Sequence, residues 1–162
     1  MSNGTRWTYR ILTSMIIGLL LSLACAYAHG QSEDEMLKTP AVLDAINELH
    51  AHTHLAGYDK AEWSFVIRQD GTPSKPQSSH EFSQNHLSVA IGSDRAIIHS
   101  HPDGTSPQPS NGDLIAAKHC KVPNYEISGY HIYVAEPDGK TIRKVSDIEQ
   151  AKHGVVIHWG TK

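Results

Sequence analysis

The chain has 162 residues, a length typical of one domain rather than two. It carries 14 basic and 17 acidic residues, a formal net charge of −3, which argues against the basic surface of a nucleic-acid-binding protein. With only two cysteines, it does not have the composition of a small scaffold held together by disulfides.

The first 28 residues predict a signal peptide for export to the periplasm or beyond the cell. Two arginines come first, the apolar run 11–26 follows, and Ala26-Tyr27-Ala28 supplies the small-x-small pattern of a cleavage site. The apolar run is shorter than the roughly 20 residues that a transmembrane helix needs, so cleavage is favoured and no stable membrane span is expected. Lipidation at Cys25 is a less favoured alternative, because its surroundings fit a lipobox poorly.

Residues 29–39 predict a polar, flexible lead-in, and one domain is expected over residues 40–162. Its first element is a helix that begins near Pro40, has apolar residues at helical spacing and stops near Gly57. A strand rich in aromatic and β-branched residues is expected over 62–67, before a turn.

The rest of the chain predicts further strands, one more helix and several loops. These elements are a loop or an irregular edge over 72–85, a short strand over 86–91, a buried strand over 95–99, a loop over 100–112, a helix over 113–120, a strand over 128–135, a turn over 137–140 and a strand over 141–145. This order of helices and strands predicts a mixed α/β sandwich.

The stretch from His99 to Asp113 predicts a metal site with an open coordination position. A strand that runs into His99-Ser100-His101 places both imidazoles on one side, because side chains alternate along a strand. The following loop turns the chain back, so that Asp113, near the start of the next helix, can complete the set. Two histidines, one carboxylate and an open fourth position are typical of a catalytic Zn²⁺ site.

The same residues resemble the motif of the JAMM (MPN+) metalloprotease family. His99-Ser100-His101-Pro102 is followed by Ser110 and, after two intervening residues, by Asp113. The resemblance covers roughly residues 44–145 and implies one domain with a mixed, curved sheet flanked by helices, similar to cytidine deaminases. It also implies a zinc hydrolase that cleaves an amide or isopeptide bond in a peptide or protein substrate. One departure is that seven residues, against six in the family, separate the proline from the serine.

The resemblance also implies roles for two further residues. Glu62 would act as the general base, taking a proton from the metal-activated water and passing it to the leaving amine. Ser110 would donate a hydrogen bond to the tetrahedral oxyanion. Glu48 and Glu81 are alternatives to Glu62, and the spacing of Ser110 and Asp113 is also that of a helix-capping box.

Other interpretations remain open. In His50-Ala51-His52-Thr53-His54 only the first and last histidines share a helix face, so a structural or surface role is favoured over a metal site. The main alternative to a hydrolase is a catalytically silent binding domain with the same fold. A zinc deaminase is a third hypothesis, less favoured because the Pro-Cys-x-x-Cys ligands of that class are absent.

Overall fold

The computed structural model describes four parts of the chain, residues 33–55, 61–78, 94–151 and 154–159. The chain divides into two compact units, Met1–Met36 and Leu37–Lys162. The predicted signal peptide and the strand predicted over 86–91 lie outside the described residues. No helix in the described parts is long and apolar enough to cross a membrane.

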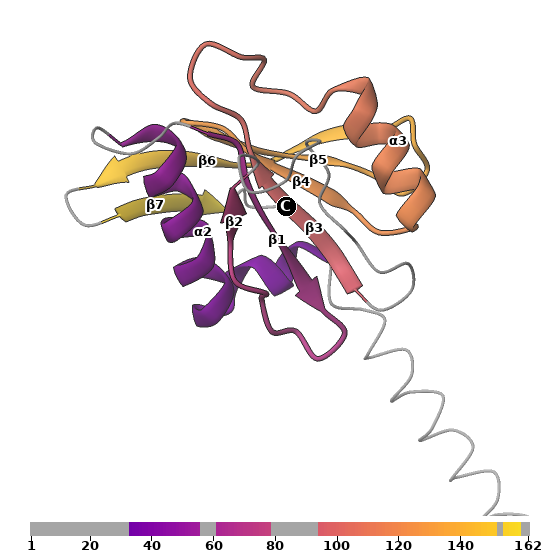
Figure 1. Ribbon diagram of the computed structural model, residues 1–162, viewed down its shortest axis with the longest axis horizontal. Coiled ribbons are helices and arrows are strands. Elements are labelled where there is room, and N and C mark those ends of the chain that lie inside the picture. The colour runs from indigo at the N-terminus through magenta and orange to yellow at the C-terminus, as the bar shows by residue number, and fades with distance from the viewer. Residues whose placement is uncertain (1–32, 56–60, 79–93, 152–153, 160–162) are drawn as a thin grey trace, which may run out of the picture. The chain divides into compact units, whose positions relative to one another are not determined.

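The second unit is a single α/β domain (Figure 1). A short 3₁₀ helix, η1 (Glu33–Lys38), begins the described part of the chain, so the predicted flexible lead-in is helical there. The remaining elements, in chain order, are α2 (Pro40–His54), β1 (Trp63–Arg68), β2 (Gln77–Ser78), β3 (Asp94–Ser100), α3 (Asn111–Cys120), β4 (Asn124–Ile127), β5 (His131–Ala135), β6 (Ile142–Ala151) and β7 (Gly154–Trp159).

The strands form one mixed sheet in the order β2-β1-β3-β4-β5-β6-β7. Neighbouring strands are antiparallel except for β3 and β4, which are parallel. Helix α3 connects these two strands, and a crossover of this kind is what lets consecutive strands run in the same direction. The predicted mixed α/β sheet is confirmed. The two-residue strand β2 is at the edge of the sheet, within the segment predicted as a loop or an irregular edge, and β4 and β7 are strands that the sequence patterns did not predict.

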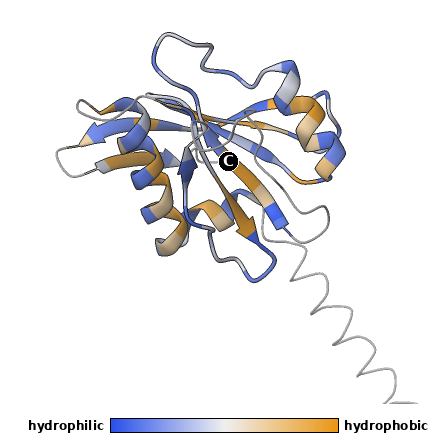
Figure 2. Cartoon of the chain, in the orientation of Figure 1, coloured by the Kyte–Doolittle hydropathy of each residue, from blue (hydrophilic) through white to orange (hydrophobic). Residues whose placement is uncertain are grey.

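Helix α2 packs against β1, β3 and β7. Because β1 and β7 lie far apart in the strand order, contact of both with one helix requires a curled sheet. Figure 2 shows hydrophobic residues along β1 and β3, next to a helix on which hydrophobic and hydrophilic residues alternate. The apolar residues Ile46, Phe65 and Ile98 are fully buried in this layer, and each such side chain contributes about 1.5–3 kcal/mol.

A close approach between α2 and β7 depends on Gly154. This residue has φ 137°, and a Cβ placed on it would lie 2.8 Å from Asn47 Oδ1. The same oxygen accepts a hydrogen bond of 2.9 Å from the backbone N–H of Val155. We therefore expect Gly154→Ala to lower the free energy of unfolding by about 1–3 kcal/mol, through backbone strain and displacement of Asn47.

Urea unfolding measures this loss, and Gly71→Ala is the matched control. Gly71 also has a positive φ, 84°, but nothing lies within 4 Å of the position that a Cβ would take there, so its substitution carries the strain without the collision. Gly154→Ala should cost more than Gly71→Ala. Equal losses would show that the contact with Asn47 is unimportant.

Candidate metal centre

His99 and His101 lie at the end of β3 and point the same way. His99 is the last residue but one of the strand, and His101 follows the strand directly. The backbone N–H of His101 still donates to the carbonyl of Ile127, at 3.1 Å, which continues the pairing with β4. The two Nε2 atoms are 3.2 Å apart. Strand alternation therefore brings the two imidazoles together, as the sequence predicts.

Asp113 joins the pair from α3. The loop after His101 brings the chain back, and α3 begins at Asn111, two residues before the predicted start. Asp113 Oδ1 lies 3.3 Å from His99 Nε2, and Oδ2 lies 4.0 Å from His101 Nε2. Ligands of a tetrahedral ion at about 2.0–2.1 Å are about 3.3–3.4 Å from one another. The three side chains are thus close to the spacing that one metal ion requires.

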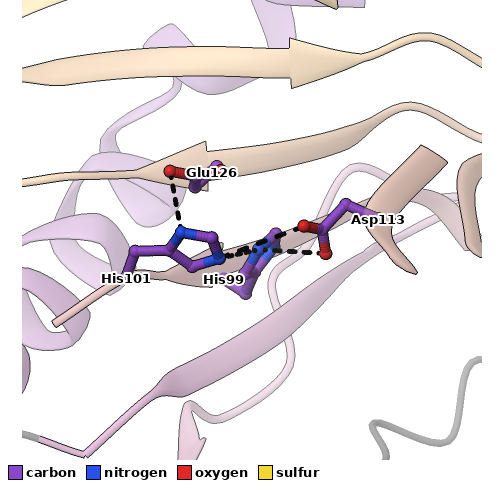
Figure 3. A group of neighbouring side chains, drawn as sticks. All are labelled: His99, His101, Asp113 and Glu126. Carbon is purple, nitrogen blue, oxygen red and sulfur yellow. Dashed lines mark hydrogen bonds and ion pairs between the residues drawn. The ribbon is translucent and has the colours of Figure 1, made fainter. Parts of the chain in front are cut away.

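Glu126 completes the group that Figure 3 shows. His99, His101, Asp113 and Glu126 each offer one potential ligand atom, and these atoms lie within 4.8 Å of one another. This buried group could hold a metal ion. Imidazole nitrogens and carboxylate oxygens are donors that suit a divalent ion of the first transition row.

Glu62 lies beside the same group. It precedes β1, which pairs with β3 so that Ser64 is opposite His99, and continuing this antiparallel register places Glu62 beside His101. Its Oε1 is 3.6 Å from His101 Nε2, and its side chain is 41% exposed. A half-exposed carboxylate at this distance can reach a molecule held at the candidate metal site. Of the two alternatives, Glu48 is exposed on α2 and Glu81 lies outside the described residues.

Ser110 is the N-cap of α3. Its hydroxyl donates to Asp113 Oδ2 at 2.7 Å, its backbone N–H donates to the same oxygen at 2.7 Å, and its Oγ accepts from the backbone N–H of Asp113 at 3.3 Å. The capping box considered at the sequence level is confirmed. Burial raises the pKa of Asp113, but the electrostatic interaction with His99 and the Ser110 hydrogen bonds outweigh it and lower the pKa overall. Ser110 therefore keeps the Asp113 carboxylate ionised and oriented.

Two polar residues of β4, Asn124 and Glu126, were missed by the sequence analysis. Asn124 Oδ1 lies 3.0 Å from His99 Nδ1, and Glu126 Oε1 lies 3.0 Å from His101 Nδ1. Both are buried, and Glu126 is completely so. The available signal was the Asn-x-Glu spacing inside an otherwise apolar segment, because residues two apart on a strand share a face.

The surroundings of His101 favour positive charge. Burial lowers the pKa of this imidazole, but the contact with Glu126, the Ser106 carbonyl and the negative charges of Glu126 and Glu62 outweigh it. Together they raise the pKa to about 9. An environment that stabilises a proton on this ring also stabilises a cation next to it.

The histidines of α2 form a separate, buried pair. His50 and His54 are 2% and 7% exposed, and their ring centroids are 4.6 Å apart. His54 Nδ1 lies 2.9 Å from Asp103 Oδ1, which links α2 to the loop after His101. His52 instead stacks on Trp63, with ring centroids 3.9 Å apart. The helix face that carries His50 and His54 therefore lies in the core, as a structural role for these two residues requires.

Acid is expected to weaken the fold through His50. Burial, and next the charge of His54, lower the pKa of His50 from 6.5 to about 4. Below pH 6.5 the unfolded chain takes up a proton that the folded chain takes up only near pH 4, so stability falls as the pH drops from about 6.5 to about 4. Each pKa unit corresponds to about 1.4 kcal/mol, so the loss is about 2–3 kcal/mol.

Urea unfolding at pH 7 and pH 5, with a chelator present, tests this expectation. His50→Gln should have a shallower pH dependence than the wild type, whereas His158→Gln, at an exposed position on β7, should not. A pH dependence of His50→Gln as steep as that of the wild type would contradict it.

The comparisons with known proteins add no relative. No protein-family model, no curated protein and no solved structure matches this chain.

Proposed function

We propose that this chain is a zinc-dependent metallopeptidase that hydrolyses an amide or isopeptide bond in a peptide or protein substrate. The observation that supports it most is the position of Glu62, 3.6 Å from His101 Nε2 beside the group formed by His99, His101 and Asp113. Zinc-assisted hydrolysis requires protein ligands for the ion and a general base. Two histidines and one carboxylate can supply the ligands, and a second carboxylate can act as the base.

The proposed roles follow from the positions of the side chains. A bound zinc ion would supply Lewis acidity and lower the pKa of a coordinated water to about 7. His99, His101 and Asp113 hold the ion in this proposal. Glu62 accepts the proton of the attacking water and delivers it to the leaving amine. Ser110 donates to Asp113, so any donation to an oxyanion requires this 2.7 Å hydrogen bond to open first.

We also propose that the domain is JAMM/MPN-like and that residues 1–28 direct its export to the periplasm or beyond the cell. The curled mixed sheet, its two described α-helices and a histidine pair at the end of β3 support the first part. The charge and hydrophobicity pattern of residues 1–28 supports the second.

Metal analysis of the purified protein tests the central claim. The wild type is expected to hold one zinc ion per chain and His99→Ala to hold none. His158→Ala, which removes an exposed imidazole from β7, is the control for nonspecific binding and should keep the ion. A wild-type protein without stoichiometric zinc would rule out the proposal.

The second candidate function is a catalytically silent binding domain. It is favoured by the capping box, in which the hydroxyl of Ser110 is already used by Asp113. On this alternative the chain binds zinc, the wild type does not hydrolyse peptides, and Glu62→Gln changes nothing that an activity assay measures.

A further inference from the structure

Strand β4 carries two buried polar side chains next to the candidate metal ligands. It lies parallel to β3, with Asn124 opposite Ile97 and Glu126 opposite His99. Asn124 is 3% exposed and Glu126 is fully buried. Two polar side chains buried in one strand of four residues are costly unless each has a specific partner.

Asn124 has its partners on both sides. Its Nδ2 donates to the backbone carbonyl of Asp113 at 3.4 Å and to Asp113 Oδ1 at 3.3 Å. Because a carbonyl oxygen can only accept, the amide must point its nitrogen at Asp113 and its oxygen at His99. The Oδ1 atom then accepts from His99 Nδ1 at 3.0 Å. One amide thus orients two of the three candidate ligands.

The hydrogen bonds of His101 fix its tautomer in the same way. Its Nδ1 lies 2.9 Å from the carbonyl oxygen of Ser106, and this oxygen cannot donate, so the proton is on Nδ1. In the neutral form that binds a metal, both imidazoles therefore carry their proton on Nδ1 and direct the lone pair of Nε2 toward the space between them. This is the arrangement that two histidines need to bind one metal ion.

Glu126 lies next to the Nδ1 edge of the His101 ring. Its Oε1 is 3.0 Å from His101 Nδ1, yet neither carboxylate oxygen has an aligned hydrogen bond within the described residues, because the N–H points to Ser106. Figure 3 shows it at the edge of the ring away from Asp113. A buried carboxylate without aligned donors needs a nearby positive charge. A metal ion bound to Nε2 would supply that charge through the imidazole.

We propose that Asn124 and Glu126 are positioning residues that hold His99 and His101 ready for one metal ion, and that Glu126 acts through His101 rather than as a ligand. The inference rests on the proposed zinc site. Outer carboxylates and amides of this kind make the ligating imidazole more basic and fix its orientation, and their removal lowers metal affinity about 10–100-fold.

Zinc affinity, measured by competition with a chelator, gives the first test. Glu126→Gln keeps the volume of the side chain and Asn124→Ala removes the amide, and each is expected to bind one zinc ion about 10–100-fold more weakly than the wild type. Glu149→Gln, at an exposed position on β6, is the matched control and should bind as the wild type does. Wild-type affinity in both test variants would overturn the proposal.

Spectroscopy separates positioning from ligation. X-ray absorption of the zinc-loaded Glu126→Gln protein should give the same number of nitrogen and oxygen ligands as the wild type, and the loss of one oxygen ligand would show that Glu126 binds the metal. Long-range ¹H–¹⁵N spectra of the metal-free protein should show His99 as the Nδ1–H tautomer, and a mixture of tautomers in Asn124→Ala. An unchanged tautomer in that variant would overturn the role of Asn124.

These outcomes are distinguishable from failure of the proposed function. A wild type that binds no zinc removes the metal site and this inference with it. If the wild type binds one zinc ion and both variants bind it with wild-type affinity, the metal site stands and only the roles of Asn124 and Glu126 are overturned. A circular-dichroism spectrum like that of the wild type shows that a variant is folded. The two variants change different residues, so if one of them fails to fold, the zinc affinity of the other still tests the proposal.

Discussion

Glu62→Gln is expected to lower kcat for amide hydrolysis by about 10²–10⁴-fold while one zinc ion per chain stays bound. The amide of Gln has nearly the shape of the carboxylate but cannot accept a proton from the attacking water. Glu62 Oε1 is 3.6 Å from His101 Nε2, close enough to reach a molecule at the metal, yet its side chain is 41% exposed, so the substitution should not unfold the domain. Hydrolysis of a panel of fluorogenic peptide and lysine-isopeptide substrates, together with zinc analysis, measures both effects.

Glu48→Gln is the matched control for this experiment. Glu48 is an exposed glutamate on α2 and was an alternative base at the sequence level, so its variant should keep wild-type kcat. Wild-type activity in Glu62→Gln would contradict the role of general base. A wild type and a Glu62→Gln variant equally inert across the whole panel would instead favour the silent binding domain.

The grouping of the candidate ligands could be predicted because their geometry is local. The spacing of His99 and His101 requires only that a strand continues to its end, and Asp113 requires only a loop that turns back into a helix. The longer loop did not prevent this return, since an added loop residue costs little free energy. Ser110 was ambiguous because its spacing from Asp113 serves a capping box as well as the family motif, and the structure shows the capping box.

The positions of Asn124 and Glu126 beside the two histidines could not be predicted, because these positions depend on how the strands pair. Asn124 and Glu126 reach the histidines only because β4 lies next to β3 in a parallel register, and no local pattern gives that register. The short strand β4 does alternate polar and apolar residues, but it has only four residues and is buried on both faces, so the alternation gives no sign that its polar side chains are buried. Similarly, helical spacing puts His50 and His54 on one face, but packing against the curled sheet decides that this face is buried.

Asp113→Asn is expected to lower zinc affinity by more than the 10–100-fold typical of outer partners, because it removes a charged ligand. The Asn amide oxygen can still accept from the Ser110 backbone, so much of the cap should survive. In the wild type, free zinc at 100 times its Kd should stabilise the fold by about 2.7 kcal/mol. That corresponds to a rise in Tm of roughly 5–10 °C for a domain of this size. In Asp113→Asn at the same zinc concentration, most of this rise should disappear.

Asp138→Asn separates the loss of a ligand from the loss of a local cap. The Asp138 carboxylate accepts hydrogen bonds from the backbone N–H groups of Lys140 and Thr141, both at 2.8 Å, in the turn between β5 and β6. Like Asp113, it organises a short segment through its own oxygens, but it is not part of the metal group. Its variant should therefore lose some stability with and without zinc and keep the full zinc-dependent rise in Tm. If Asp113→Asn kept that rise as well, the carboxylate would serve only as a helix cap, and the two histidines would need a different third ligand.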